Sequence, residues 1–225
     1  MSQTVSQTYL SPVSQPVALF DDFIARDPQQ IILKEKISSL SGDSFDIKVA
    51  DGTPLLNVNG NRFSFTGRKK VEDMNGKHLF DIRKEHMHLH TTYLMEDPAG
   101  NKICEVRSSH KCECFGIRAK ADRQLVNSSD FELLTLLVIG SKATAVFYDH
   151  YNKETTLIME GNWSDHTATI VNEETGQSVA RISRKRFNPR HIIFGQDTYR
   201  VTVAPGVDMA LIAGLCICFD EKNND

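Results

Sequence analysis

The chain has 225 residues, of which 40% are hydrophobic and 24% are charged, an ordinary composition for a soluble domain with one large buried core. Its 26 Lys and Arg residues and 29 Asp and Glu residues give a net charge of -3, which excludes a general attraction to nucleic acid and requires any anion-binding surface to be a local patch. The N-terminus lacks the basic and apolar regions of a secretory signal, and the five cysteines are an odd number, so we expect an intracellular, cytoplasmic protein without a disulfide framework.

The first segment, residues 1–16, consists mainly of Ser, Gln and Thr with two prolines, Pro12 and Pro16. A segment of this composition cannot bury enough apolar surface to offset the entropy that it loses on ordering. We therefore predict a disordered or loosely attached N-terminal arm over residues 1–16 and one domain over residues 17–225.

A repeated turn pattern follows the arm. Gly52, Gly76, Gly100 and Gly176 each lie in a sequence typical of a hairpin turn, and the first three are evenly spaced. After each glycine, positions +4 and +6 are apolar while positions +5 and +7 are polar or charged. Because side chains alternate across a strand, each unit has one dry face and one wet face. The pattern predicts an antiparallel meander; residues 131–139 are apolar nearly throughout, and periodicity leaves open whether they form a strand or a short helix.

Near the C-terminus, residues 207–219 form an apolar run in which Asp208 is the only charge. The run can be a membrane anchor, a signal for a partner or the interior of the protein. As a helix it would measure roughly 20 Å, too short for roughly 30 Å of bilayer hydrocarbon. A helix that is apolar all round has to be surrounded by protein or by lipid, and a run of this length favours protein. We therefore predict no transmembrane span and a core helix formed by Val207, Met209, Leu211, Ile212, Leu215, Ile217 and Phe219, with Pro205 in its first turn and Asp208 at its N-terminal end.

Five segments carry a resemblance to a known family: residues 79–84, 89–93, 103–108, 161–163 and 199–208, the last reading Tyr-Arg-Val-Thr-Val-Ala-Pro-Gly-Val-Asp. Together they resemble the LURP-one-related family of plants and fungi, which is similar in fold to the tubby C-terminal domain and to phospholipid scramblases. The resemblance implies a mainly β fold, a closed antiparallel barrel of about twelve strands that encloses a hydrophobic C-terminal helix. The meander and the apolar run lead separately to the same arrangement.

The functions that the resemblance implies are broad. Tubby domains bind phosphoinositides at a basic surface, scramblases are linked to lipid movement, and LURP-one-related proteins have roles in plant defence. The chain has neither the cysteine-rich palmitoylation cluster nor the Asp-rich calcium loop of the scramblase branch, which argues against scrambling activity.

The search for catalytic and metal-binding patterns gives one weak candidate. His86, His88 and His90 would share one face of a strand and could supply part of a zinc or copper site, although the site would need a fourth ligand from elsewhere. The chain has no nucleophile elbow, phosphate-binding loop, metalloprotease or dinucleotide-binding motif. We expect a protein that is not an enzyme and that needs no cofactor.

Two basic clusters lie where loops are expected. Arg and Lys side chains at such positions can contact the phosphates of a lipid headgroup. The candidates are Arg68, Lys69, Lys70, Arg184, Lys185, Arg186 and Arg190. The leading hypothesis is a non-enzymatic binding module, peripheral to a membrane, that contacts anionic phospholipid or phosphoinositide. One alternative is a scaffold with a protein partner, which the polar arm supports. The other is a metal-dependent enzyme, which only the three histidines support.

Overall fold

The computed structural model describes residues 10–36, 44–60, 67–85, 92–109, 141–149, 152–162, 167–184 and 198–224. They contain a short 3-10 helix, twelve strands and one long helix. In chain order these are η1 (Asp21–Phe23), β1 (Gln29–Lys36), β2 (Ser44–Val49), β3 (Pro54–Gly60), β4 (Lys69–Asp73), β5 (His78–Glu85), β6 (Thr92–Glu96), β7 (Lys102–Ser109), β8 (Ser141–Tyr148), β9 (Glu154–Asn162), β10 (Thr167–Asn172), β11 (Ser178–Arg184), β12 (Thr198–Val203) and α3 (Met209–Asn224).

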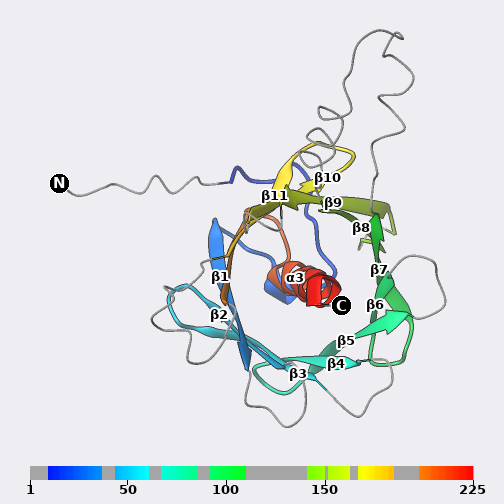
Figure 1. Ribbon diagram of the computed structural model, residues 1–225. Helices are drawn as coiled ribbons and strands as arrows, with labels where there is room; N and C mark the ends of the chain where they lie inside the picture. Colours follow the sequence, from blue (N-terminus) through cyan, green and yellow to red (C-terminus); the bar gives the residue numbers. More distant parts are fainter. Residues whose placement is uncertain are drawn as a thin grey trace, which may run out of the picture.

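The strands form a closed antiparallel barrel. Each strand pairs with its neighbours in the sequence, and β1 closes the ring by pairing with β12, from Gln29 opposite Val203 to Lys34 opposite Thr198. Figure 1 shows α3 at the centre of the ring, with part of the blue segment that precedes β1 beside it. The predicted fold class is therefore confirmed. Residues 131–139 lie outside the described residues.

The repeat seen in the sequence is the hairpin of this barrel. Gly52, Gly76, Gly100 and Gly176 all have positive φ, a conformation that glycine adopts without steric cost. The +4 and +6 positions after each glycine are buried against the core: Leu56, Val58, Phe80, Ile82, Cys104, Val106, Ala180 and Ile182. Several turns are also held by an aspartate, since Oδ1 of Asp73 accepts the backbone N–H groups of Asn75 and Lys77, and Asp97 binds Ala99 and Asn101 in the same way.

The apolar run fills the barrel. Leu211, Ile212, Leu215, Ile217 and Phe219 are each 4% exposed or less, and Val207 is fully buried. Two details of the prediction were wrong. The helix begins at Met209 and not at Val207, because Val207 and Asp208 form isolated bridges with Val17 and Ile24. Pro205 therefore lies in the turn before the helix and not in its first turn. Met209 itself is only partly buried.

A segment that we call the strap, residues 10–25, closes the end of the barrel where α3 begins. Leu10, Val17 and Ala25 are buried, and the backbone N–H groups of Val17 and Ala25 donate to the carbonyls of Gly206 and Val207. Residues 10–16 thus lie within the strap, whereas residues 1–9 lie outside the described residues. The division into an arm and a barrel domain at residues 16 and 17 stays a prediction.

One carboxylate joins the strap to the helix. Asp208 is completely buried immediately before α3. Its Oδ1 accepts the N–H groups of Ala210 and Leu211 at 2.7 and 3.1 Å, and its Oδ2 accepts those of Leu19 and Phe20 at 3.0 and 2.9 Å. Asp208 is therefore both the N-cap of α3 and the anchor of the strap.

Gly161 of β9 marks a close approach between strands. A Cβ atom at this position would lie 2.4 Å from the carbonyl oxygen of Thr167 and 2.6 Å from the Cα of Ala168. We expect Gly161→Ala to lower the free energy of unfolding by about 3 kcal/mol, the upper range for overpacking, because these neighbours are backbone atoms of β10. Gly100→Ala is the control: nothing lies within 4 Å of its Cβ, so only its positive φ opposes the change, at about 1 kcal/mol. Urea unfolding of both variants measures the difference, and equal losses would contradict the interpretation.

Candidate functional site

The two ends of the barrel differ. At one end the even-numbered strands lead into the next odd-numbered strand through tight turns such as residues 97–101, β12 leads into α3, and the strap crosses; we call this the turn end. At the opposite end, which we call the mouth, strands begin or stop at residues such as Lys69, Glu85 and Arg184, and α3 ends at Asn224. Apart from Gly67 and Arg68 before β4, the connections between strands at the mouth lie outside the described residues.

The described residues of the predicted basic clusters lie at the mouth. Arg68 precedes β4, Lys69 and Lys70 begin this strand, and Arg184 ends β11. Around the ring, β3, β2, β1 and β12 separate β4 from β11, so these residues stand at different points of the rim. The remaining predicted residues, Lys185, Arg186, Arg190, His86, His88 and His90, lie outside the described residues.

Lys69 is not on the outer surface. Its side chain is only 4% exposed and its Nζ lies 3.0 Å from Oε1 of Glu221 in α3. Close to this pair, the hydroxyl of Tyr199 in β12 donates to Oδ1 of Asp220. Lys69 shares the inward row of β4 with Val71, because side chains alternate along a strand. Lys69 is therefore not a surface cation, and its ammonium group is already paired with Glu221 inside the rim.

Arg68 belongs to a network of charges across β4, β5 and β6. Its Nη1 and Nη2 atoms lie 2.9 Å from Asp81 and 2.9 Å from Glu96. Arg83 binds the other oxygen of Glu96 at 2.7 Å, and Nε2 of His78 lies 3.1 Å from Asp81. The two carboxylates are well buried, and charge-assisted pairs of this kind hold the guanidinium in a fixed orientation. Arg68 is thus a positioned cation and not a freely mobile one.

Charge is unevenly distributed along the barrel axis. The strand-end residues at the mouth, together with the last turns of α3, are mostly basic. The basic residues are Lys34, Lys36, Arg68, Lys69, Lys70, Arg83, Lys84, Arg107, Lys142, Arg184, Arg200 and Lys222, and the acidic ones are Glu35, Asp46, Glu85, Glu160, Asp220 and Glu221. Four further acids, Glu72, Asp81, Glu96 and Glu105, stand farther along the strands and pair with Arg68, Lys70, Arg83 and Arg107.

The turn end has the opposite balance. Its acidic residues are Asp21, Asp22, Asp27, Asp51, Asp73, Asp97, Asp149, Glu154, Glu173, Glu174 and the buried Asp208, against Arg26, Lys48, Lys77, Lys102 and Lys153. The turn hydrogen bonds keep carboxylates ionised, since the backbone N–H of Lys77 is the main cause that lowers the pKa of Asp73. In the described part of the protein, the balance of charged residues therefore differs between the two ends of the barrel: it is basic at the mouth and acidic at the turn end.

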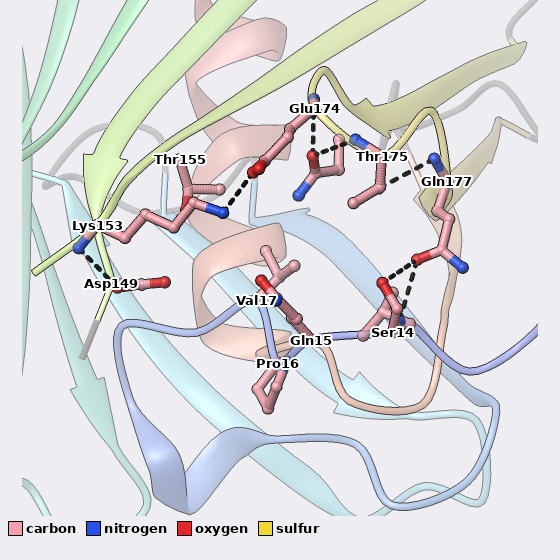
Figure 2. A pocket seen from close by; sticks show the side chains of 12 residues that line it. Ser14, Gln15, Pro16, Val17, Asp149, Lys153, Thr155, Glu174, Thr175 and Gln177 are labelled. Carbon is pink, nitrogen blue, oxygen red and sulfur yellow. Dashed lines mark hydrogen bonds and ion pairs between the residues drawn. The ribbon is translucent and has the colours of Figure 1, made fainter. Parts of the chain in front are cut away.

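A small pocket lies at the turn end, where the strap crosses the β8–β9 and β10–β11 turns (Figure 2). The N–H and hydroxyl groups of Ser14 both donate to Oε1 of Gln177 at 3.0 Å, and Lys153 pairs with Glu174 at 2.5 Å. The enclosed part is about the size of one water molecule, which excludes an organic substrate.

The thiols of the described interior are not reactive. Cys104, Cys216 and Cys218 are free, buried thiols, and burial raises the pKa of Cys104 to about 12, so it is not a thiolate at neutral pH. Within the described ranges, no three His, Cys, Asp or Glu side chains are grouped so that they could hold a metal ion. None of the described helices has the length and apolar character needed to cross a membrane.

The sequence profile of the LURP-one-related family matches residues 29–220. The chain belongs to this family. Among curated LURP-one-related proteins of Arabidopsis thaliana, LURP-one-related 5 is 24% identical over 91% of this chain and 88% of its own length, and LURP-one-related 15 is 27% identical over 71% of this chain and 75% of its own. LURP1 of the same plant is 22% identical over 93% of this chain and 91% of its own.

A solved structure shows the same fold. The X-ray structure of a protein from Arabidopsis thaliana superposes with a TM-score of 0.51 at 17% identity, covering 92% of this chain and 99% of that one. The fold is therefore shared at low sequence identity.

Two features of this LURP-one-related chain were missed by sequence reasoning. Asp81 is one of the polar positions of the repeat and Glu96 lies outside the repeat, so the pattern does not pair them, although they stand opposite each other in β5 and β6. The pairing of Lys69 with Glu221 left no local signal, because it joins a strand and a helix that are distant in the sequence.

Proposed function

We propose that the protein is a non-enzymatic binding module whose mouth contacts an anionic membrane phospholipid, with phosphoinositides as the preferred class. The observation that carries the proposal is the axial separation of charge, because it gives the barrel one end that attracts an anionic surface and one that is repelled by it.

The exposed cations of the mouth support contact with phosphate groups. The side chain of Arg107 is 69% exposed and those of Lys70 and Arg68 are 46% and 43% exposed, so they reach solvent although each also pairs with a carboxylate. Each basic side chain near an anionic membrane contributes about 1 kcal/mol, so several together give reversible, salt-sensitive binding.

The scaffold alternative has less support. Among the described residues, the large exposed hydrophobic side chains are Met74 and Tyr148, both near the turn end. The β6–β7 hairpin separates them around the ring, and single exposed apolar residues are normal on a monomer. They do not make a patch for a protein partner.

Vesicle sedimentation tests the proposal. We expect the protein to bind phosphatidylcholine vesicles that contain phosphatidylinositol 4,5-bisphosphate, less tightly at high salt, and not to bind phosphatidylcholine alone. The double variant Lys70→Glu/Arg107→Glu should bind these vesicles at least about tenfold more weakly, because it reverses two cations at the mouth.

The control is Lys77→Glu/Lys102→Glu, which makes the same change in net charge at the turn end. We expect its affinity to stay close to that of the unchanged protein. Equal losses in the two double variants would mean that only net charge matters, and an absence of binding at low salt would refute the proposal.

A further inference from the structure

The last turns of α3 break a rule of helix electrostatics. The C-terminal end of a helix carries a partial negative charge, so carboxylates there are unfavourable. Asp220 and Glu221 nevertheless occupy this end, and Asp220 is only 3% exposed. Positions where a sequence violates a local preference are often functional, because the cost has to be offset elsewhere.

The barrel wall supplies the offset. Nζ of Lys69 lies 3.0 Å from Oε1 of Glu221, and the hydroxyl of Tyr199 donates to Asp220. The two contacts reach α3 from β4 and β12, which lie on different sides of β1, β2 and β3 in the ring. The end of the helix is therefore clamped to the inner rim of the mouth.

Burial shows which partner faces outward. The side chain of Lys69 is 4% exposed and that of Glu221 is 23% exposed. Glu221 is thus the more exposed partner of the pair, and Lys69 has almost no contact with solvent. An anion that binds Lys69 has to displace Glu221 from it.

We infer that Glu221 is an internal counter-ion that blocks the mouth. The inference rests on the function proposed above: the phosphate of an anionic phospholipid competes with the carboxylate of Glu221 for Lys69, and the last turn of α3 moves aside when the protein docks. Binding by the unchanged protein is weaker than the charge of the mouth alone would give, because a resident carboxylate has to be displaced.

Substitution of Glu221 tests the inference. Glu221→Gln removes the competing charge and keeps the size of the side chain, so it should bind vesicles of phosphatidylcholine and phosphatidylinositol 4,5-bisphosphate about fivefold more tightly, the effect of one additional cation at the surface. Glu160→Gln is the matched control, since Glu160 is an exposed acid near the mouth end of β9, and it should change binding less. Lys69→Met/Glu221→Gln should return the affinity to that of the unchanged protein.

A second measurement needs no substitution. Hydrogen exchange of the unchanged protein should become faster over residues 217–224 when these vesicles are added, because the last turn of α3 loses its contact with Lys69. Added inorganic phosphate distinguishes the source of the anion: it should not reproduce the faster exchange if a membrane lipid is the ligand.

The outcomes separate the two proposals. If the unchanged protein binds but Glu221→Gln binds equally and exchange over residues 217–224 stays the same, the inference is overturned and the proposed function stands. If neither protein binds, both are overturned. Melting curves of each variant show whether a change in binding reflects loss of the fold.

Discussion

A chain that stops at Asp208 is expected to lose the closed barrel. Removal of α3 would strip the inner faces of the strands of Leu211, Ile212, Leu215, Ile217 and Phe219. At about 2 kcal/mol for each large buried side chain, these residues contribute on the order of 10 kcal/mol, comparable to the whole stability of a typical domain. We expect the shortened chain to be insoluble or to lack a cooperative melting transition in circular dichroism.

A chain that stops at Glu221 is the matched control. It keeps the buried helix residues and the pair between Lys69 and Glu221, so it should melt as a cooperative unit. If the chain that stops at Asp208 stays soluble and melts like the full chain, α3 is not the core of the barrel.

The inward row of each strand could be predicted, because burial is a local consequence of alternation. Leu56, Phe80, Cys104 and Ala180 stand at the same offset from their turn glycines, and all four face α3. The same rule, applied to β4, would have placed Lys69 in the inward row with Val71. The prediction that Lys69 lies at the surface followed its charge and not the alternation of side chains along β4.

The partners of the charged residues could not be predicted. Arg68 binds Asp81 and Glu96 because the register of β4, β5 and β6 brings these residues together, and a shift of one residue would move every side chain to the other face. Glu221 meets Lys69 because α3 has one rotation and depth inside the barrel. A helix that is apolar all round carries no stripe that defines this rotation.

Asp208→Ala is expected to lower the free energy of unfolding by about 3 kcal/mol at pH 7. The change leaves the N–H groups of Leu19, Phe20, Ala210 and Leu211 without their acceptor. Loss of an N-cap costs about 1–2 kcal/mol, and each additional unsatisfied N–H costs about 1–3 kcal/mol, while removal of a buried charge offsets part of the loss. Urea unfolding measures the effect, and hydrogen exchange should show the strap opening before the strands do.

The pH dependence of this loss is a sharper test of the same carboxylate. Burial raises the pKa of Asp208 to about 6, although its four backbone donors act in the opposite direction. Because this value lies above about 3.9 for an unfolded chain, the folded protein holds the proton more tightly. The contribution of the group to stability is complete below about pH 4 and is lost as the pH rises through 6. The difference in unfolding free energy between the unchanged protein and Asp208→Ala should therefore shrink by about 2–3 kcal/mol from pH 4 to pH 7. The difference from Asp208→Asn, which does not titrate and keeps one acceptor oxygen, should shrink by the same amount. A difference that stays constant would show that the N–H groups of the strap and of α3 hold Asp208 ionised throughout, so that this cap is a permanent charge at the start of the helix.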